Sequence, residues 1–414
     1  MKLKKYKFGA KTYIAIVDGA DCPVDPYVTA YICSMSGGVA FNTAVRYAAE
    51  LIFVLTHFSY KQIDLVSRVG SGQLISDYEY MQWYDKCCFS VGAVHDLGVL
   101  SFKKMGGKGF RNIISANQRV MSRVNGNTTR GRLRRLREFL EWLFAKFHYK
   151  REVAMEITEA LSRLTQKMRL DEEGIRPNES RGLKSLDESV IPDGVFERLL
   201  EIIKPSSPDN PFKKAKHRNY LIVSVLAQSG IRRGALAKAK ISDFQFYGSF
   251  DSFQVYRSVD ESMDPRLDKP NQKTRAHIAT IEPELMKEIK YYIDVTRAAI
   301  HEAILHDYVF VSETNSRETV GQPLSLKSIN SIFHVLSQAL NFHIHPHMLR
   351  HKWNEIYDAK GVAMGVDQRR LEDARKYAMG WSQNSTMNEI YNQKRLAKLA
   401  REISRCHQER IDRL

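Results

Sequence analysis

The chain has 414 residues, of which 43% are hydrophobic and 27% are charged, and 63 Lys and Arg against 47 Asp and Glu give a net charge of +16. The length favours two or three folded domains, the composition excludes extensive disorder, and the positive charge favours a nucleic acid as partner. The longest apolar stretch, 48–58, is too short to cross a bilayer and no signal-peptide pattern is present, so we expect a cytoplasmic protein.

The five cysteines are an odd number without CxxC spacing, namely Cys22, Cys33, Cys87, Cys88 and Cys406. This pattern fits neither a disulfide framework nor a structural zinc site. We expect reduced and mostly buried thiols.

Before Gly38, short apolar runs alternate with turn residues, which predicts a small strand-containing element. Further along, residues 101–151 contain 14 basic residues and only two acidic ones. Apolar residues there recur at steps of three and four, and they are Leu133, Leu136, Leu140, Leu143 and Phe147. This spacing predicts a helix with one face in a core, and arginines crowd its start.

Guanidinium and ammonium groups turned outward from such a helix and its preceding loop would contact phosphates and release counterions. The candidate DNA-binding residues are Lys103, Lys104, Lys108, Arg130, Arg132, Arg134 and Arg135. No GxxxxGK[ST] pattern is present, so ATP use has no support in the sequence. A cluster of turn formers in 171–192 predicts a domain boundary.

Beyond this boundary, 220–228 reads as a buried helix that ends in Ser-Gly-Ile-Arg-Arg-Gly-Ala-Leu, with Arg232 after the glycine break. Two predicted strands follow, 253–259 and 276–281, and a polar turn between them contains Lys269 and Lys273.

The next motif is His-Ile-His-Pro-His-Met-Leu-Arg-His at 343–351. Pro346 can occupy the first turn of a helix that continues to about Lys360, before a glycine. His347 and Arg350, at i and i+3, then share a face and can converge on one phosphate. A zinc site is the weaker alternative, because no HExxH glutamate is present and an arginine would oppose a cation. We expect no metal and no cofactor.

The last motif is Gly-Trp-Ser at 380–382, followed ten residues after Trp381 by Tyr391. A second tyrosine, Tyr377, lies nearby, and its place in the helical pattern of Leu371, Ala374 and Ala378 indicates core packing.

These strings resemble the signature boxes of the tyrosine recombinase (phage integrase) family over about residues 190–395. The resemblance implies that Arg232, Lys269, His347, Arg350, Trp381 and Tyr391 are the catalytic residues, with Tyr391 rather than Tyr377 as the nucleophile. It assigns the lysine role to Lys269 rather than Lys273, because the family lysine precedes the hairpin turn. Two departures are Trp381, where histidine is common, and Ala235, where an acidic residue is common.

The resemblance implies a mainly α fold with a small antiparallel β-sheet, in several domains. These are a basic helical core-binding domain at 81–172, a linker at 173–192 and a tyrosine recombinase catalytic domain at 193–395. For residues 1–80, an arm-type element and an extension of the core-binding domain both remain open. The amphipathic segment 396–414 is expected to dock on a neighbouring protomer, with packing on its own chain as the alternative.

The implied function is site-specific cleavage and rejoining of DNA through a 3′-phosphotyrosyl intermediate, without metal or ATP, for integration or excision of a mobile genetic element. The implied partners are double-stranded DNA and a homotetramer on two DNA sites, with the protein associated with the nucleoid. Two alternatives remain: a DNA-binding protein of the same fold without catalysis, and a type IB topoisomerase or telomere resolvase.

Overall fold

The computed structural model describes residues 1–9, 11–91, 123–149, 154–176, 191–247, 251–258, 264–267, 269–314, 319–389, 396, 400, 403–404 and 406–408. The chain divides into two compact units, Met1–Leu183 and Lys184–Leu414. The division falls inside the turn-rich stretch that the sequence marks as a boundary.

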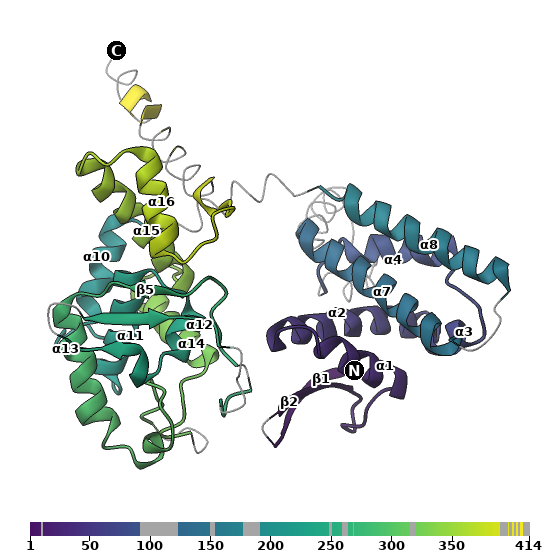
Figure 1. Ribbon diagram of the computed structural model, residues 1–414, viewed down its shortest axis with the longest axis horizontal. Helices are drawn as coiled ribbons and strands as arrows, with labels where there is room; N and C mark the ends of the chain where they lie inside the picture. Colours follow the sequence, from purple (N-terminus) through teal and green to yellow (C-terminus); the bar gives the residue numbers. More distant parts are fainter. Residues whose placement is uncertain are drawn as a thin grey trace, which may run out of the picture. The chain divides into compact units, whose positions relative to one another are not determined.

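The first unit begins with an antiparallel hairpin and continues with helices (Figure 1). Its described elements are β1 (Lys2–Phe8), β2 (Lys11–Val17), α1 (Pro26–Ser36), α2 (Phe41–Tyr60), α3 (Leu65–Gly70), α4 (Asp77–Cys87), α7 (Gly126–Phe147) and α8 (Met155–Gly174). The hairpin therefore confirms the predicted strand-containing element, and the apolar stretch 48–58 lies inside α2.

One hydrophobic cluster serves this whole unit. It joins residues from β2, α1 and α2, such as Ile16 and Leu51, to Leu136 and Leu140 of α7 and Met168 of α8. All four leucines predicted to lie on one face of α7 are buried. The described residues of 1–80 thus share one core with the helices that follow.

The second unit is also mostly helical, with one small three-stranded antiparallel sheet in the order β3-β4-β5. Its described elements are α10 (Asp193–Ile202), α11 (Lys216–Ser229), α12 (Arg233–Lys238), η3 (Ile241–Asp243), β3 (Phe244–Gln245), β4 (Ser252–Val255), β5 (His277–Ala279), α13 (Pro283–Tyr291), η4 (Tyr292–Arg297), η5 (His301–Leu305), α14 (Leu326–Ala339), α15 (Pro346–Ala363) and α16 (Gln368–Ala378). The fold class is the expected one, mainly α with small antiparallel sheets.

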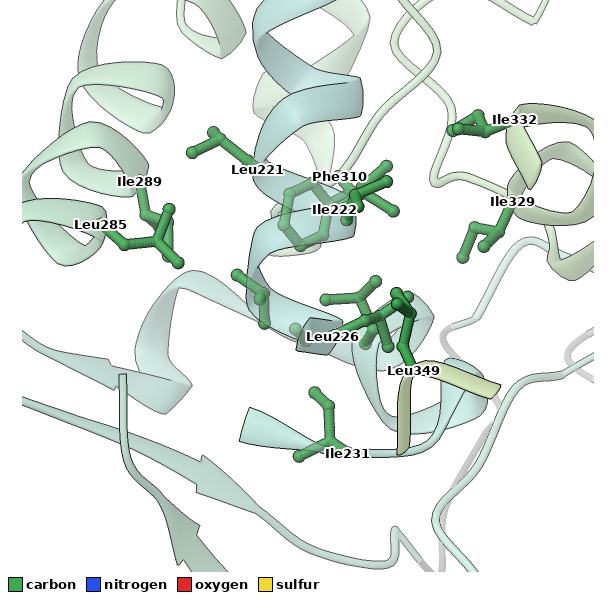
Figure 2. Close-up of a cluster of buried hydrophobic side chains, with 14 of the residues drawn as sticks. Leu221, Ile222, Leu226, Ile231, Leu285, Ile289, Phe310, Ile329, Ile332 and Leu349 are labelled. Carbon is green, nitrogen blue, oxygen red and sulfur yellow. The ribbon is translucent and has the colours of Figure 1, made fainter. Parts of the chain in front are cut away.

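Helix α11 lies at the centre of the second core. Its Leu221, Ile222 and Leu226 are fully buried, and side chains of α13, α14 and α15 pack around it (Figure 2). No residue of α11 is exposed, and even its polar Arg218 and Asn219 are buried, as expected for a helix inside a core. The turn at its C-terminal end is therefore held in a fixed place.

Several details differ from the sequence expectations. Helix α15 passes Gly361 and ends at Ala363, because Gly361 allows close packing: a Cβ there would lie 2.3 Å from Leu371. Strand β4 ends at Val255, short of the predicted length.

The expectation of mostly buried thiols is wrong, since Cys87 is buried but Cys22, Cys33 and Cys406 are exposed. Among the helices that the structure describes, none combines the length and apolar character needed to span a membrane.

Candidate active site

Arg232 lies in the turn between α11 and α12. Helix α11 ends at Gly230, whose φ of 60° is left-handed, and Arg232 then takes an extended conformation at the N-terminus of α12. A Cβ on Gly230 would lie 2.8 Å from the ring of Trp353. Only glycine suits both the conformation and this close approach, so the glycine break before Arg232 is a packing requirement.

Arg350 reaches the same turn from α15, which begins at Pro346 as predicted. It is 1% exposed, and its Nη1 donates a hydrogen bond of 2.7 Å to the carbonyl oxygen of Gly230. Nearby, Trp353 Nε1 donates to the carbonyl oxygen of Gln228, also at 2.7 Å. These two bonds fasten α15 to the end of α11 and bring the two arginine motifs, 118 residues apart in the sequence, together.

Trp381 is buried beside Arg350. The guanidinium carbon of Arg350 lies 5.7 Å from the centroid of the indole ring, within the range of a cation–π contact. Gly380, with φ of 61°, brings the chain close to the hairpin, because a Cβ there would lie 2.6 Å from the carbonyl oxygen of Arg275. The third motif therefore meets the second at this point.

His347 lies on α15 one turn before Arg350, and its side chain is exposed. Its ring is 4.5 Å from that of His351, in an edge-on arrangement. Within the described ranges, no group of three or more His, Cys, Asp or Glu side chains is arranged to hold a metal ion. Burial lowers the pKa of His345, which favours the neutral ring expected of a structural histidine.

Both candidate lysines lie in the segment between β4 and β5, and they differ in how far their side chains are exposed. Lys269 is 9% exposed and has φ of 32°, whereas Lys273 is exposed. Between them, Asn271 accepts a hydrogen bond from the backbone N–H of Ser258 (3.2 Å) and donates one to its carbonyl oxygen (2.9 Å). A Cβ on Gly234 would lie 2.8 Å from the carbonyl oxygen of Asn271. The lysine-bearing segment is thus packed directly against α12, next to Arg232.

A second bond ties this segment to the third motif: the backbone N–H of Arg275 donates to the carbonyl oxygen of Gly380 at 2.8 Å. Four pieces of chain therefore meet in one region, namely the ends of α11 and α12, the β4–β5 segment, the start of α15 and the turn after α16.

Tyr391 lies outside the described residues. The chain just before it is anchored in this region, because Met387 packs on Trp381, and the buried Asn388 donates to the carbonyl oxygen of Glu372 on α16. The expectation that Tyr377 is core packing is wrong: its side chain is 75% exposed. Leu371 of the same pattern is buried as expected, but the second buried residue of α16 is Arg375 and not Tyr377, so Tyr377 must be excluded as the nucleophile by experiment.

His277, the first residue of β5, also lies in this region and was not predicted from the sequence. With Trp381 and Tyr377 it lines a cavity of about 610 Å³, together with residues of β4, β5 and α16. Burial is the main cause that lowers the pKa of His277, and the nearby cations Arg350 and Arg232 lower it further. A histidine in a short strand carries no sequence signal for such a location.

The candidate DNA-binding arginines of α7 fall into two classes. Arg132 is buried and donates to the carbonyl oxygens of Cys87 and Phe89, and the buried Arg135 bonds to the Tyr31 hydroxyl. The expectation that these two guanidinium groups point outward is wrong, since both bind polar groups of their own unit.

Arg134 is half-exposed and pairs with Glu172 at 3.2 Å. Arg130 also faces α8, where it donates to the carbonyl oxygen of Glu172, and both arginines line a cavity of about 480 Å³. Lys103, Lys104 and Lys108 lie outside the described residues.

Comparison with known proteins gives a family. The phage integrase family matches residues 189–397, half of the chain. No curated protein sequence matches. Among solved structures, XerA recombinase is 18% identical over 89% of this chain and 93% of its own, with a TM-score of 0.34. The Tn1549 transposon integrase in complex with circular intermediate DNA is 14% identical over 90% and 98%, with a TM-score of 0.43. A lambda integrase dimer bound to a COC′ core site is 12% identical over 94% of each chain, with a TM-score of 0.36. On the match over residues 189–397, this chain belongs to the phage integrase family.

Proposed function

We propose that this protein is a site-specific DNA recombinase that cuts and rejoins DNA strands through a tyrosine nucleophile. The observation that carries the proposal is that the two arginine motifs meet. Arg350 bonds to the carbonyl oxygen of Gly230, which lies two residues before Arg232 in the chain. Two cations held together at the end of an apolar core attract an anion, and a phosphodiester matches the fork of a guanidinium.

In the proposed reaction, the phenolic oxygen of Tyr391 attacks the scissile phosphorus. A bond forms to the 3′-phosphate, and the bond to the 5′-oxygen breaks. Arg232 and Arg350 bind the nonbridging oxygens and stabilise the charge of the pentavalent state. His347 assists loss of the tyrosine proton, Lys269 protonates the departing 5′-oxygen, and Trp381 supports the phosphate by packing and its N–H.

Rejoining reverses these steps with a 5′-hydroxyl from a second strand. The phosphoester linkage is conserved in the protein–DNA bond, so the cycle consumes no ATP, and the arginines supply the positive charge that a metal ion would otherwise provide. This arrangement suits integration or excision of a mobile element, where broken ends must never be released.

DNA binding and assembly complete the proposal. The basic first unit would contact DNA through the half-exposed Arg134 and through the lysines around Lys104, which lie outside the described residues. Beyond Tyr391, the apolar side chains of Leu396 and Ile403 are 59% and 62% exposed. Apolar side chains spaced seven apart lie on one helix face, which would dock on a neighbouring subunit of a tetramer.

A covalent-adduct assay tests the chemistry. A duplex enriched by the protein from a random-sequence library is nicked next to each candidate phosphate and incubated with protein in EDTA. We expect wild type and Tyr377→Phe to form an adduct that survives denaturant, and Tyr391→Phe to form none. Binding without an adduct from wild type would favour a non-catalytic DNA-binding protein, and relaxation of plasmids that lack the enriched site would favour a topoisomerase.

A further inference from the structure

His277 lies at the meeting point of the hairpin and the third motif. It starts β5 and pairs with Val255 of β4. Its ring packs on Gly380, since a Cβ at that glycine would lie 2.4 Å from His277 Nδ1. Gly380 precedes Trp381, which contacts Arg350. The imidazole therefore lies against the turn that carries Trp381, close to Arg350 and Arg232.

The hydrogen bonding of the ring defines which nitrogen carries a proton. Nδ1 lies 3.1 Å from the carbonyl oxygen of Arg275. A carbonyl oxygen only accepts, so Nδ1 carries the hydrogen and donates it. In the neutral ring, Nε2 then presents a lone pair. That atom is buried, and within the described part of the chain it has no hydrogen-bond partner.

The charges around the ring favour this neutral form. Burial and the two cations Arg350 and Arg232 lower the pKa of His277 below its usual value. The other titratable or charged residues that line the adjoining cavity are Tyr256, Arg275, Asp373, Lys376 and Tyr377. Only one of these is acidic, so the surroundings as a whole oppose a third positive charge.

We infer that His277 is a positioning residue for Arg350: once DNA is bound, Nε2, which has no partner among the described residues of the free protein, accepts a hydrogen bond from the guanidinium and fixes the orientation in which Arg350 meets the phosphate. This inference rests on the proposed function. Because Nε2 is enclosed, it cannot touch DNA and acts through its neighbour. A guanidinium has five N–H donors, so it can bind a phosphate while protein acceptors hold other donors. A neutral acceptor orients the cation and leaves its positive charge in place, whereas a carboxylate would offset that charge.

A kinetic comparison separates this role from a structural one. His277→Leu removes the acceptor, His277→Gln keeps a carbonyl oxygen that can accept, and His301→Leu makes the same change at an exposed histidine on η5. On the nicked duplex, we expect single-turnover adduct formation by His277→Leu to be about tenfold to a hundredfold slower, with DNA affinity and melting temperature unchanged. His277→Gln should recover most of the rate, and His301→Leu should match wild type.

The pH profile gives a second readout. Wild type should lose rate as the pH falls through the pKa of His277, because protonation removes the lone pair and adds repulsion, whereas the Leu and Gln variants should lack that acidic limb. Equal rates for wild type and His277→Leu would overturn the inference, as would a slow variant that also melts earlier and binds DNA more weakly.

A spectroscopic test does not depend on activity. In protein labelled with ¹⁵N-histidine, His277 Nε2 should show the shift of an unprotonated nitrogen near neutral pH. Arg350→Gln should raise the pKa of His277, because a neighbouring cation is removed. An unchanged pKa would refute the contact even if adduct formation succeeds. Absence of any adduct from wild type would instead refute the proposed function. The change in the pKa of His277 in Arg350→Gln would then still test the contact between the two side chains.

Discussion

Replacement of Arg132 by methionine should destabilise the first unit without directly weakening DNA binding. Arg132 Nη1 donates to Cys87 O at 3.0 Å and to Phe89 O at 2.7 Å, and the guanidinium carbon lies 3.9 Å from the centroid of Phe53. Methionine keeps most of the apolar stem but leaves two carbonyl oxygens without these donors. Hydrogen bonds to charged groups contribute about 1.5–3 kcal/mol each, and the cost of burying the charge offsets part of this, so a loss of about 2–4 kcal/mol is expected.

Thermal unfolding of the full chain measures this loss. For a unit of this size, 1 kcal/mol corresponds to about 2–4 °C, so the melting transition of the first unit should fall by roughly 4–16 °C. Arg134→Met is the matched control on the same helix. Its side chain is 51% exposed, and its partner Glu172 keeps Arg137 at 3.0 Å, so the transition should move little.

For DNA affinity, the exposed-arginine variant should have the larger effect and the buried-arginine variant the smaller one, the reverse of their effects on melting temperature. Arg134→Met should bind more weakly and lower the salt dependence by about one counterion, while Arg132→Met should bind normally below its melting transition. The reasoning is refuted if Arg132→Met melts like wild type but loses DNA affinity, because its guanidinium would then face the DNA.

Three further changes probe the second unit. Gly380→Ala should abolish adduct formation, since its Cβ would lie 2.4 Å from His277 and φ there is 61°; an active, normally folded variant would contradict the close packing. Asn271→Ala removes both bonds to Ser258 and should slow cleavage about tenfold by displacing Lys269, with recovery when sulfur replaces the departing 5′-oxygen, because a thiolate leaves without protonation. If the sulfur-substituted DNA does not restore the cleavage rate, Asn271 does not act through Lys269. EDTA should leave wild-type rates unchanged, and a loss of rate that added divalent metal restores would point to a metal-dependent reaction.

The local motifs of the second unit could be predicted because their physical causes are local. Pro346 fixes the start of α15, and Gly230 ends α11 as the glycine break indicates. The same segments carry Arg232 and Arg350, so recognition of the motifs also indicates which residues meet. Their actual contact, through Gly230, could only be seen in the folded chain.

Other features depend on partners far along the chain. Arg132 and Arg134 look alike in the sequence, but the carbonyl oxygens that bind Arg132 lie 43 and 45 residues earlier. Tyr377 fits a helical apolar pattern with Leu371, yet α16 buries Leu371 and Arg375 and leaves Tyr377 exposed. His277 becomes part of the candidate site only because Gly380 lets the turn approach the hairpin. No local periodicity encodes these three outcomes.

The most direct test of the central claim is identification of the tyrosine that bears the DNA. After adduct formation, nuclease digestion leaves a short nucleotide on the protein. Trypsin alone would leave Tyr377 and Tyr391 in one peptide, but cleavage after Glu389 separates them. Mass spectrometry should find the nucleotide on the peptide that contains Tyr391. A nucleotide on Tyr377, or on any other residue, would contradict the account.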